Sequence, residues 1–401
     1  MAWTINPAAP VMETAAPPPP RWDTFAGEYA LRPGAQPGVL GQRPVLSDGR
    51  LGQLLRGQRG DDVVHRLGSV FSLCAHAHQR AAALALAAAQ GQTRDTARPP
   101  FALWLETARD HLRSMALDWP QRLPEADVAG PDLHWLRGCP LPLFARQAPT
   151  DASAALDQLG QLRAWLEDRI LGQSIGQWLQ ACAAPEAFAH WCQAQAERLP
   201  PARFLSAWYP LASRLHIPAH GLQVLHQDPM QQKQRLIELA QAMVHQSGFV
   251  QHPVWRGQCA ENGPWTRLRH SPQQQGVPRS AWWRLSARWL ELLALAQAAS
   301  DASDDPDATG AGGMLSTGAL WLAQGQALGW CEMARGLLLH WVQLDASDGV
   351  LDYRVLAPTE WNFHPQGALA QAVAALASND QAPAAMLAAA FDPCVSCTVA
   401  T

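Results

Sequence analysis

The sequence predicts a mainly α protein of the α+β class, with one large multi-helix domain and a small β-hairpin or sheet element. Three features indicate this. The alanine-rich run at 81–89 favours helix because alanine loses no side-chain entropy when a helix forms. Apolar residues recur at helical spacing between Trp282 and Ala296. Near the end of the chain, two apolar and aromatic runs flank an Asp-Gly turn.

Helical periodicity continues over most of the chain. Between Trp282 and Ala296, the apolar side chains fall on one face, which is typical of a helix buried along one side. Further helices are expected at roughly 62–90, 100–117, 152–197, 230–247 and 366–390. The acidic, glycine-containing segment 301–313 (DASDDPDATGAGG) predicts a mobile surface loop.

The predicted β-hairpin is the exception to the helical pattern. Its first strand is expected within Arg335–Asp345 (RGLLLHWVQLD) and its second within Val350–Leu356 (VLDYRVL). The intervening Asp348-Gly349 pair is typical of a tight turn between antiparallel strands.

At 401 residues the chain can bury a large core, either as one big domain or as two smaller ones. We expect a single domain at 26–401, preceded by a flexible, proline-rich leader at 1–25. Of the 401 residues, 48% are apolar and 16% charged, with a net charge of −4. This balance gives no bulk attraction to nucleic acid or to an anionic membrane. Because no signal peptide or membrane span is apparent in the sequence, we expect a cytoplasmic protein with reduced cysteines.

Five of the eight cysteines have no metal-type spacing and are expected to be small core residues. They are Cys139, Cys182, Cys192, Cys259 and Cys331. The other three are candidate metal ligands. Cys394 and Cys397 form a C-x-x-C near the chain end, and this spacing suits one soft metal or a redox disulfide. Cys74 and His78 share one face of a predicted helix, which by itself fits a buried cysteine beside a hydrogen-bonded histidine.

Several short motifs resemble, in the same order, those of the nickel–iron hydrogenase large subunit. They include the closing FDPCVSC, the ARGLLLHW segment at 334–341 and the APTEWN segment at 357–362. The segment at 253–267 (PVWRGQCAENGPWTR) and the one at 109–119 (RDH, then LDW) match two further family motifs. More narrowly, the chain resembles the accessory HoxV/HupK-type proteins, which look like degenerate large subunits. The resemblance implies the large-subunit fold for the multi-helix domain.

The resemblance also implies roles for the cysteines. In the family, one cysteine of each of two C-x-x-C motifs binds nickel terminally and the other bridges nickel and iron. Cys74 and Cys397 match the bridging positions, and Cys394 matches one terminal nickel ligand. The other terminal position is Phe71, whose ring has no lone pair to donate. Nickel binding is therefore not expected, whereas an Fe(CN)2(CO) fragment keeps both of its thiolates.

The expected surroundings of the iron fragment also follow from the resemblance. Arg335 and Thr359 would donate hydrogen bonds to the cyanides, and Pro358 would form part of the pocket wall. His78 would hydrogen-bond a cysteine sulfur. Asp110 and Asp392 match acidic residues near the family site, although either could instead serve structure, Asp392 as a turn cap.

Other departures from the family argue against catalysis. No R-x-E-G-H segment precedes Cys74, so the family's proton-relay glutamate has no counterpart. The position of the family's final, processing-site histidine is Ala400, and only Thr401 follows, so no removable extension is expected.

The function expected from the resemblance is a non-catalytic scaffold in hydrogenase maturation. It would hold the iron fragment for transfer to the large-subunit precursor, and small iron-carrying maturation chaperones would be its other partners. One alternative is an active or hydrogen-sensing large subunit that pairs with an iron–sulfur small subunit. Another is a metal-free interaction protein in which the cysteines no longer bind metal.

Overall fold

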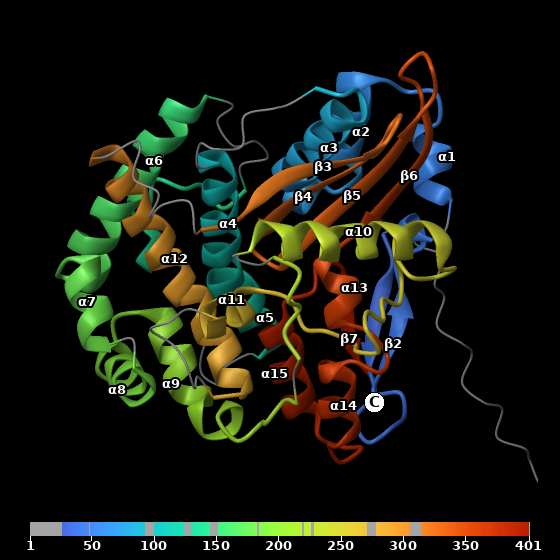
Figure 1. Cartoon of the computed structure of the whole chain (residues 1–401). Coiled ribbons are helices and arrows are strands. Elements are labelled where there is room, and N and C mark those ends of the chain that lie inside the picture. The colour runs from blue at the N-terminus through green and yellow to red at the C-terminus, as the bar shows by residue number, and fades with distance from the viewer. Residues whose placement is uncertain are drawn as a thin grey trace, which may run out of the picture.

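A four-stranded sheet and a long central helix organise the molecule, which is described here from a computed structural model (Figure 1). The structure describes residues 26–47, 49–92, 100–123, 130–144, 151–182, 184–218, 220–225, 228–270, 278–304 and 314–400. The predicted leader, 1–25, lies outside the described residues. The mainly α fold with a small antiparallel sheet confirms the predicted class.

The α-helices are α1 (Arg50–Leu55), α2 (Gly60–Val70), α3 (Ala75–Ala89), α4 (Phe101–Arg113), α5 (Trp119–Arg122), α6 (Ala152–Trp165), α7 (Ile175–Cys182), α8 (Pro185–Gln195), α9 (Pro200–Ala212), α10 (Pro229–His245), α11 (Pro264–His270), α12 (Ala281–Asp304), α13 (Pro358–Asn362), α14 (Ala368–Ala374) and α15 (Gln381–Phe391). The strands are β1 (Glu28–Leu31), β2 (Val39–Gln42), β3 (Thr317–Ala323), β4 (Gln326–Met333), β5 (Gly336–Leu344), β6 (Val350–Leu356) and β7 (Ser396–Val399).

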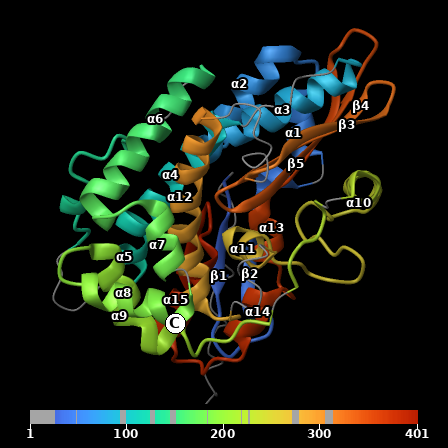
Figure 2. The same ribbon diagram turned by 60° about the vertical axis from the view of Figure 1, so that its left-hand side comes forward.

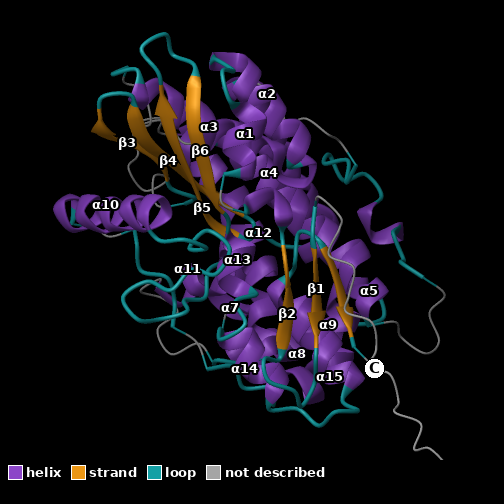
Figure 3. Cartoon of the chain, turned by 90° about the vertical axis from the view of Figure 1, so that its right-hand side faces the viewer, coloured by secondary structure: helices purple, strands orange, loops and turns teal. Residues whose placement is uncertain are grey.

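The predicted hairpin is confirmed as β5 and β6, which pair antiparallel on either side of the Asp-Gly turn. The sequence did not predict the two strands beside it, which complete the order β3-β4-β5-β6. Their small residues, such as Gly318 and Gly329, obscure the alternation that normally marks a strand. Helix α3 packs against β3, β4 and β5, while α10 crosses the opposite side of the sheet (Figures 1 and 3).

Close approach of α3 to β4 depends on Gly329. A Cβ atom at this position would lie 2.3 Å from the carbonyl oxygen of Ala81 and 2.7 Å from the amide nitrogen of Ala85. Both contacts are with backbone, so the helix itself would have to move. We expect Gly329→Ala to lower the free energy of unfolding by about 1–3 kcal/mol, the usual cost of overpacking a core.

Urea unfolding would measure this effect, with Gly160→Ala as the matched control. Gly160 lies in α6, and a Cβ atom there would meet nothing within 4 Å. The control should leave stability unchanged or raise it by up to ~1 kcal/mol, because alanine restricts the unfolded chain. Equal midpoints for the two variants would contradict the close-packing account.

A second sheet joins the two ends of the described chain. Strand β1 pairs antiparallel with β2 and parallel with β7 (Figure 3). In this register Tyr29 is opposite Cys397. This pairing places the C-terminal cysteine motif beside the first strand, although more than 360 residues separate them.

The long helix predicted around Trp282–Ala296 is confirmed as α12. The prediction that it is buried along one side only is wrong. Every residue from Ala281 to Leu293 is buried, because α4, α6, α9, α11 and α15 all pack against this helix (Figure 2). The buried charged residues of this helix form ion pairs with residues of other elements. The helix continues to Asp304, four residues into the segment 301–313 that was predicted as a loop; residues 305–313 lie outside the described residues.

The other helical predictions hold with added breaks. The stretch 62–90 is interrupted at Phe71–Cys74, 152–197 divides into α6, α7 and α8, and 366–390 divides into α14 and α15. The described part of the chain contains no helix with the length and hydropathy required to cross a bilayer. Of the cysteines predicted as core residues, Cys192 and Cys331 are fully buried, and Cys139, Cys182 and Cys259 are partly buried.

Candidate metal centre

Cys74 lies at the break between α2 and α3, where it occupies the N-cap position of α3 without a capping hydrogen bond from its side chain. The first amides of that helix are satisfied by Glu106 of α4, whose two carboxylate oxygens accept from the N–H groups of His76 at 2.8 Å and Ala77 at 2.9 Å. Burial raises the pKa of Glu106 to about 8, assisted by the neighbouring charge of Asp110. The helix terminus that carries Cys74 is thereby fixed to α4.

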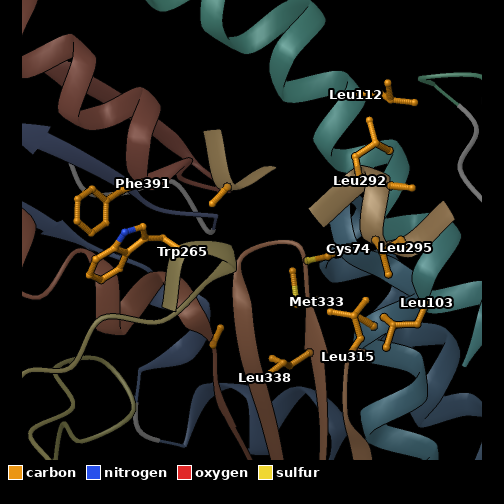
Figure 4. Close-up of a cluster of buried hydrophobic side chains, with 14 of the residues drawn as sticks. Cys74, Leu103, Leu112, Trp265, Leu292, Leu295, Leu315, Met333, Leu338 and Phe391 are labelled. Carbon is orange, nitrogen blue, oxygen red and sulfur yellow. The ribbon is translucent and has the colours of Figure 1, made fainter. Parts of the chain in front are cut away.

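Cys74 is 5% exposed and belongs to the main hydrophobic core, together with Met333 and Leu103 (Figure 4). Burial raises the pKa of its thiol well above the ordinary value, and the nearby Cys394 raises it further. Cys394 lies near enough for its charge to act on the Cys74 thiol. Arg335 acts in the opposite direction and favours the thiolate of Cys74.

Cys394 follows the end of α15 and faces the start of α13. Its sulfur lies 3.1 Å from the hydroxyl oxygen of Thr359, close enough for a hydrogen bond. Thr359 is buried, and Pro358 before it occupies the first turn of α13 and is buried too. Proline suits this position, because its fixed φ matches a helix start and its missing N–H has no partner there. The predicted Thr359 and Pro358 thus lie beside Cys394.

Arg335 joins the β4–β5 turn to α4 and to the C-terminal segment. Its guanidinium nitrogens lie 3.0 Å from an Asp110 oxygen and 3.3 Å from an Asp392 oxygen. A third nitrogen donates to the carbonyl oxygen of Asp392 at 3.1 Å. Guanidinium has five N–H donors, so two remain for a ligand. Charges of Cys394 and Cys74 also act on Arg335, which places it at the same site.

The two aspartates differ in their protonation behaviour although both contact Arg335. Burial raises the pKa of Asp110, and Arg335 only partly opposes that effect. Burial would also raise the pKa of Asp392, but the charges of Arg335 and Arg288 outweigh this effect and hold the pKa below its ordinary value. Asp392 receives the additional Arg288 contact at 3.7 Å and a hydrogen bond from the Ser114 hydroxyl. It also adopts a left-handed backbone conformation with φ of 49°, consistent with the predicted turn role.

Cys397 does not share the surroundings of Cys74 and Cys394. It lies in β7, and its neighbour is Arg122, which donates a hydrogen bond to the Cys397 carbonyl oxygen at 3.4 Å. Burial raises the pKa of the Cys397 thiol to about 11, with Arg122 opposing the shift. Within the described part of the chain, neither Cys74 nor Cys394 affects that pKa. The predicted pairing of Cys74 with Cys397 is therefore not seen as a contact and stays a prediction.

Three residues of the site, Arg43, Tyr29 and Glu360, were not predicted from the sequence. No motif marks Arg43 or Tyr29, and Glu360 lies within the APTEWN segment but was given no role. Arg43 follows β2, is 6% exposed and contacts Glu360 at 3.5 Å. Burial acts to lower the pKa of Arg43, but the charges of Cys394 and Glu360 outweigh it and raise the pKa. Tyr29 of β1 interacts with Glu360 and is also close enough to Cys394 for their charges to interact. The Nε atom of Arg43 is buried and has no hydrogen-bond partner among the described residues.

His78 and Phe71 form the side of the site nearest the sheet. The ring of Phe71 stacks on the imidazole of His78, with centroids 3.8 Å apart and planes 8° from parallel. The guanidinium group of Arg43 lies over the ring of Phe71, with its carbon atom 5.6 Å from the ring centroid. His78 Nδ1 lies 3.0 Å from Nε2 of His340, whose Nδ1 lies 2.7 Å from the hydroxyl of Tyr353.

The structure thus gathers most of the predicted site residues and separates one of them. Cys74, Cys394, Arg335, Thr359, Asp110 and Asp392 are linked by direct contacts or by electrostatic effects on one another. His78 adjoins them through Phe71, and no contact given by the described residues joins Cys397 to this group. No three histidine, cysteine or acidic side chains converge as a metal site within the described ranges. A metal held at this site would depend on two thiolates and on ligands that it brings.

The fold is that of the nickel–iron hydrogenase large subunits. The chain superposes with a TM-score of 0.52 on the Ni-Fe-Se hydrogenase of D. vulgaris Hildenborough in the reduced state, with 16% identity over 89% of this chain and 92% of that chain. A G491S variant of the [NiFeSe] hydrogenase gives a TM-score of 0.53 with 17% identity, over 85% and 90% of the chains. Identity this low establishes the fold alone. Residues 274–400 match the family model described as nickel-dependent hydrogenase.

Sequence comparison then narrows the class to a family. The chain is 37% identical to the hydrogenase expression/formation protein HoxV of Cupriavidus necator, over 94% of this chain and 95% of that protein. It is 28% identical to the hydrogenase expression/formation protein HupK of Rhizobium leguminosarum bv. viciae, over 86% and 88%. The chain therefore belongs to the HoxV/HupK family of hydrogenase expression/formation proteins, which confirms the predicted resemblance.

Proposed function

We propose that this protein acts in hydrogenase maturation as a non-catalytic scaffold that holds an Fe(CN)2(CO) fragment for transfer to the large-subunit precursor. Its family relatives are named hydrogenase expression/formation proteins, which supports the maturation role. The observation that carries the scaffold role is a buried group of contacts around two thiols. Cys394 lies 3.1 Å from the Thr359 hydroxyl, Arg335 is held by Asp110 and Asp392, and both Cys394 and Arg335 act electrostatically on the buried Cys74 thiol. A cytoplasmic location and contacts with small iron-carrying chaperones are parts of the same proposal.

The surroundings of the two thiols fit such a cargo. Soft thiolates suit iron with strong-field ligands. Bound cyanide has an electron-rich nitrogen that accepts hydrogen bonds, and Arg335 has two N–H groups not used by the protein. Arg43 adds its unpartnered Nε and a second positive charge. The leucine and methionine side chains around Cys74 supply the apolar wall that carbonyl, a poor acceptor, prefers.

The charge balance also favours loading of an anionic unit. Two thiolates and two cyanides bring more negative charge than ferrous iron neutralises, and a buried excess charge requires compensation. The guanidinium groups of Arg43 and Arg335 supply it when their partners Glu360 and Asp110 are protonated, and burial raises the pKa of both carboxyl groups. Because the Cys74 thiol has a raised pKa, iron binding must displace its proton, so loading should weaken as the pH falls.

Nickel is not expected in the complex. The Phe71 ring packs on His78 and offers no lone pair, and the positive charge of Arg43 is close to both Phe71 and Cys394. A cation in this position repels a second metal ion. We therefore propose a cargo with one iron and no nickel.

Infrared spectroscopy tests the scaffold directly. Protein purified from cells with intact maturation machinery should show cyanide and carbonyl stretching bands. We expect Cys74→Ser and Cys394→Ser to lose these bands, because each removes one of the two neighbouring thiolates. Cys397→Ser should keep them, since no contact or electrostatic effect joins Cys397 to Cys74 or Cys394 among the described residues.

Two results would change the assignment. Loss of the bands in Cys397→Ser, with retention in Cys394→Ser, would support the ligand pair implied by family resemblance. Absence of the bands from the wild-type protein would overturn the scaffold proposal. Stoichiometric nickel by metal analysis would instead favour a hydrogen-sensing or catalytic subunit.

A further inference from the structure

His78 is the most tightly held polar side chain near Cys74. It is 1% exposed, and the ring of Phe71 covers one face of its imidazole at a centroid distance of 3.8 Å. On its Nδ1 edge, His340 of β5 contacts it at 3.0 Å. Stacking and hydrogen bonding together fix both the plane and the rotation of the ring.

A second contact extends this hydrogen bond to the neighbouring strand. Nδ1 of His340 lies 2.7 Å from the hydroxyl oxygen of Tyr353 in β6. His340 and Tyr353 are 0% and 1% exposed, so water cannot replace either partner. Burial lowers the pKa of His340 to about 3 and also lowers that of His78, so each ring is neutral and carries one N–H.

The direction of the hydrogen bonds follows from Tyr353. Its hydroxyl has one hydrogen, and His340 is its sole hydrogen-bond partner in the described part of the chain. If Tyr353 only accepted, its own hydrogen would be buried without an acceptor, at a cost of about 1–3 kcal/mol. The hydroxyl therefore donates to Nδ1 of His340. The His340 proton then lies on Nε2 and is donated to Nδ1 of His78.

This direction determines the tautomer of His78. With Nδ1 acting as an acceptor, the proton of the neutral ring must lie on Nε2. No acceptor for that N–H is present among the described residues. Side chains of a helix lean toward its N-terminus, so His78 lies over the turn that contains Cys74, four residues earlier. An Nε2–H group at this position is available to an acceptor bound beside Cys74.

We propose that Tyr353 and His340 are positioning residues that fix His78 as an Nε2–H donor to an electron-rich atom of the bound cargo. The chemical class of the acceptor is a metal-bound anion, either a thiolate sulfur or a cyanide nitrogen. The identity of this acceptor rests on the proposed function, whereas the tautomer of His78 does not. Phe71 gains a role in the same arrangement, since it holds the imidazole flat.

Nitrogen NMR of the metal-free protein labelled with 15N-histidine tests the tautomer. We expect wild-type His78 to show a protonated Nε2 and an unprotonated Nδ1, with His78→Gln used to assign its signals. Tyr353→Phe should bring a measurable fraction of the Nδ1–H form, because the hydroxyl no longer sets the direction of donation. Tyr209→Phe is the control, since Tyr209 is 40% exposed and distant in sequence from this chain of bonds.

The wild-type spectrum alone can overturn the inference, even if Tyr353→Phe does not fold. A His78 ring protonated at Nδ1 would contradict the proposed direction. The inference would also be overturned if Tyr353→Phe folded and left the His78 signals unchanged.

Infrared bands of the iron-loaded protein test the acceptor. Tyr353→Phe should shift the cyanide bands relative to wild type, and Tyr209→Phe should not. Unshifted bands in a variant whose His78 tautomer has changed would overturn donation to the cargo. Absence of bands from the wild type would overturn the proposed function and leave the NMR result standing.

Discussion

Replacing Arg335 with methionine should lower the free energy of unfolding by about 3–5 kcal/mol, the usual cost of removing one partner from a buried ion pair. Asp110 and Asp392 would both lose their contacts with this guanidinium at 3.0 and 3.3 Å. Asp392 keeps Arg288 at 3.7 Å, whereas Asp110 has no second ion pair among the described residues. The loss is large against a typical stability of about 5–15 kcal/mol. Urea unfolding monitored by circular dichroism measures it.

A matched control comes from an exposed pair. Arg256 contacts Glu238 at 2.8 Å, but their side chains are 51% and 31% exposed. Arg256→Met should therefore cost no more than about 1 kcal/mol. Adding Asp110→Asn to Arg335→Met should recover part of the loss, since it removes one uncompensated carboxylate. A midpoint for Arg335→Met equal to that of Arg256→Met would show that the buried network does not hold the site together.

Glu291→Gln should have a comparable effect, with a characteristic dependence on pH. The carboxylate of Glu291 contacts two nitrogens of Arg267 at 2.7 and 2.8 Å and Nε2 of His111 at 2.7 Å. Burial alone would raise the pKa of Glu291, but these partners lower it from 4.5 to about 2. A shift of this size corresponds to about 3 kcal/mol of stability. The variant should lose that amount at neutral pH.

The sign of the pH dependence follows from the depressed pKa. The contribution of Glu291 is fully present above its unfolded pKa of about 4.5 and is lost as the pH falls toward about 2. The difference in stability between wild type and Glu291→Gln should therefore be constant from pH 7 to 5 and shrink at pH 4 and 3. Urea midpoints at these pH values measure it, with Glu238→Gln as the exposed control. A difference that stays constant down to pH 3 would contradict the ion-pair account.

Both predictions concern charged residues that hold the candidate site from outside the cysteine motifs. Arg335 ties the β4–β5 turn to α4 and the C-terminal segment, and Glu291 ties α12 to α4 and α11. Each contact joins elements that are far apart in the sequence. Damage to either should therefore loosen the approach of Cys74 to Cys394 as well as the fold.

The sequence by itself determined the helical character, the β5–β6 hairpin and, through its ordered motifs, the family. These features depend on local spacing or on short segments, so they can be recognised without knowing what packs where. Most of the predicted site residues also came together, because the motifs that carry them occupy the elements around Cys74.

Only the tertiary structure decided which thiols are neighbours, which charges are buried and which residues complete the site. Arg284, Arg288 and Glu291 are charged residues that a helical pattern assigns to solvent, yet all three are buried, because Glu261, Asp392 and Arg267 neutralise them from other elements. Arg43, which follows β2, likewise lies near enough to Cys394 for their charges to interact, without any motif to mark it. Pairing over such distances leaves no local pattern, because its energy arises only when the whole chain is folded.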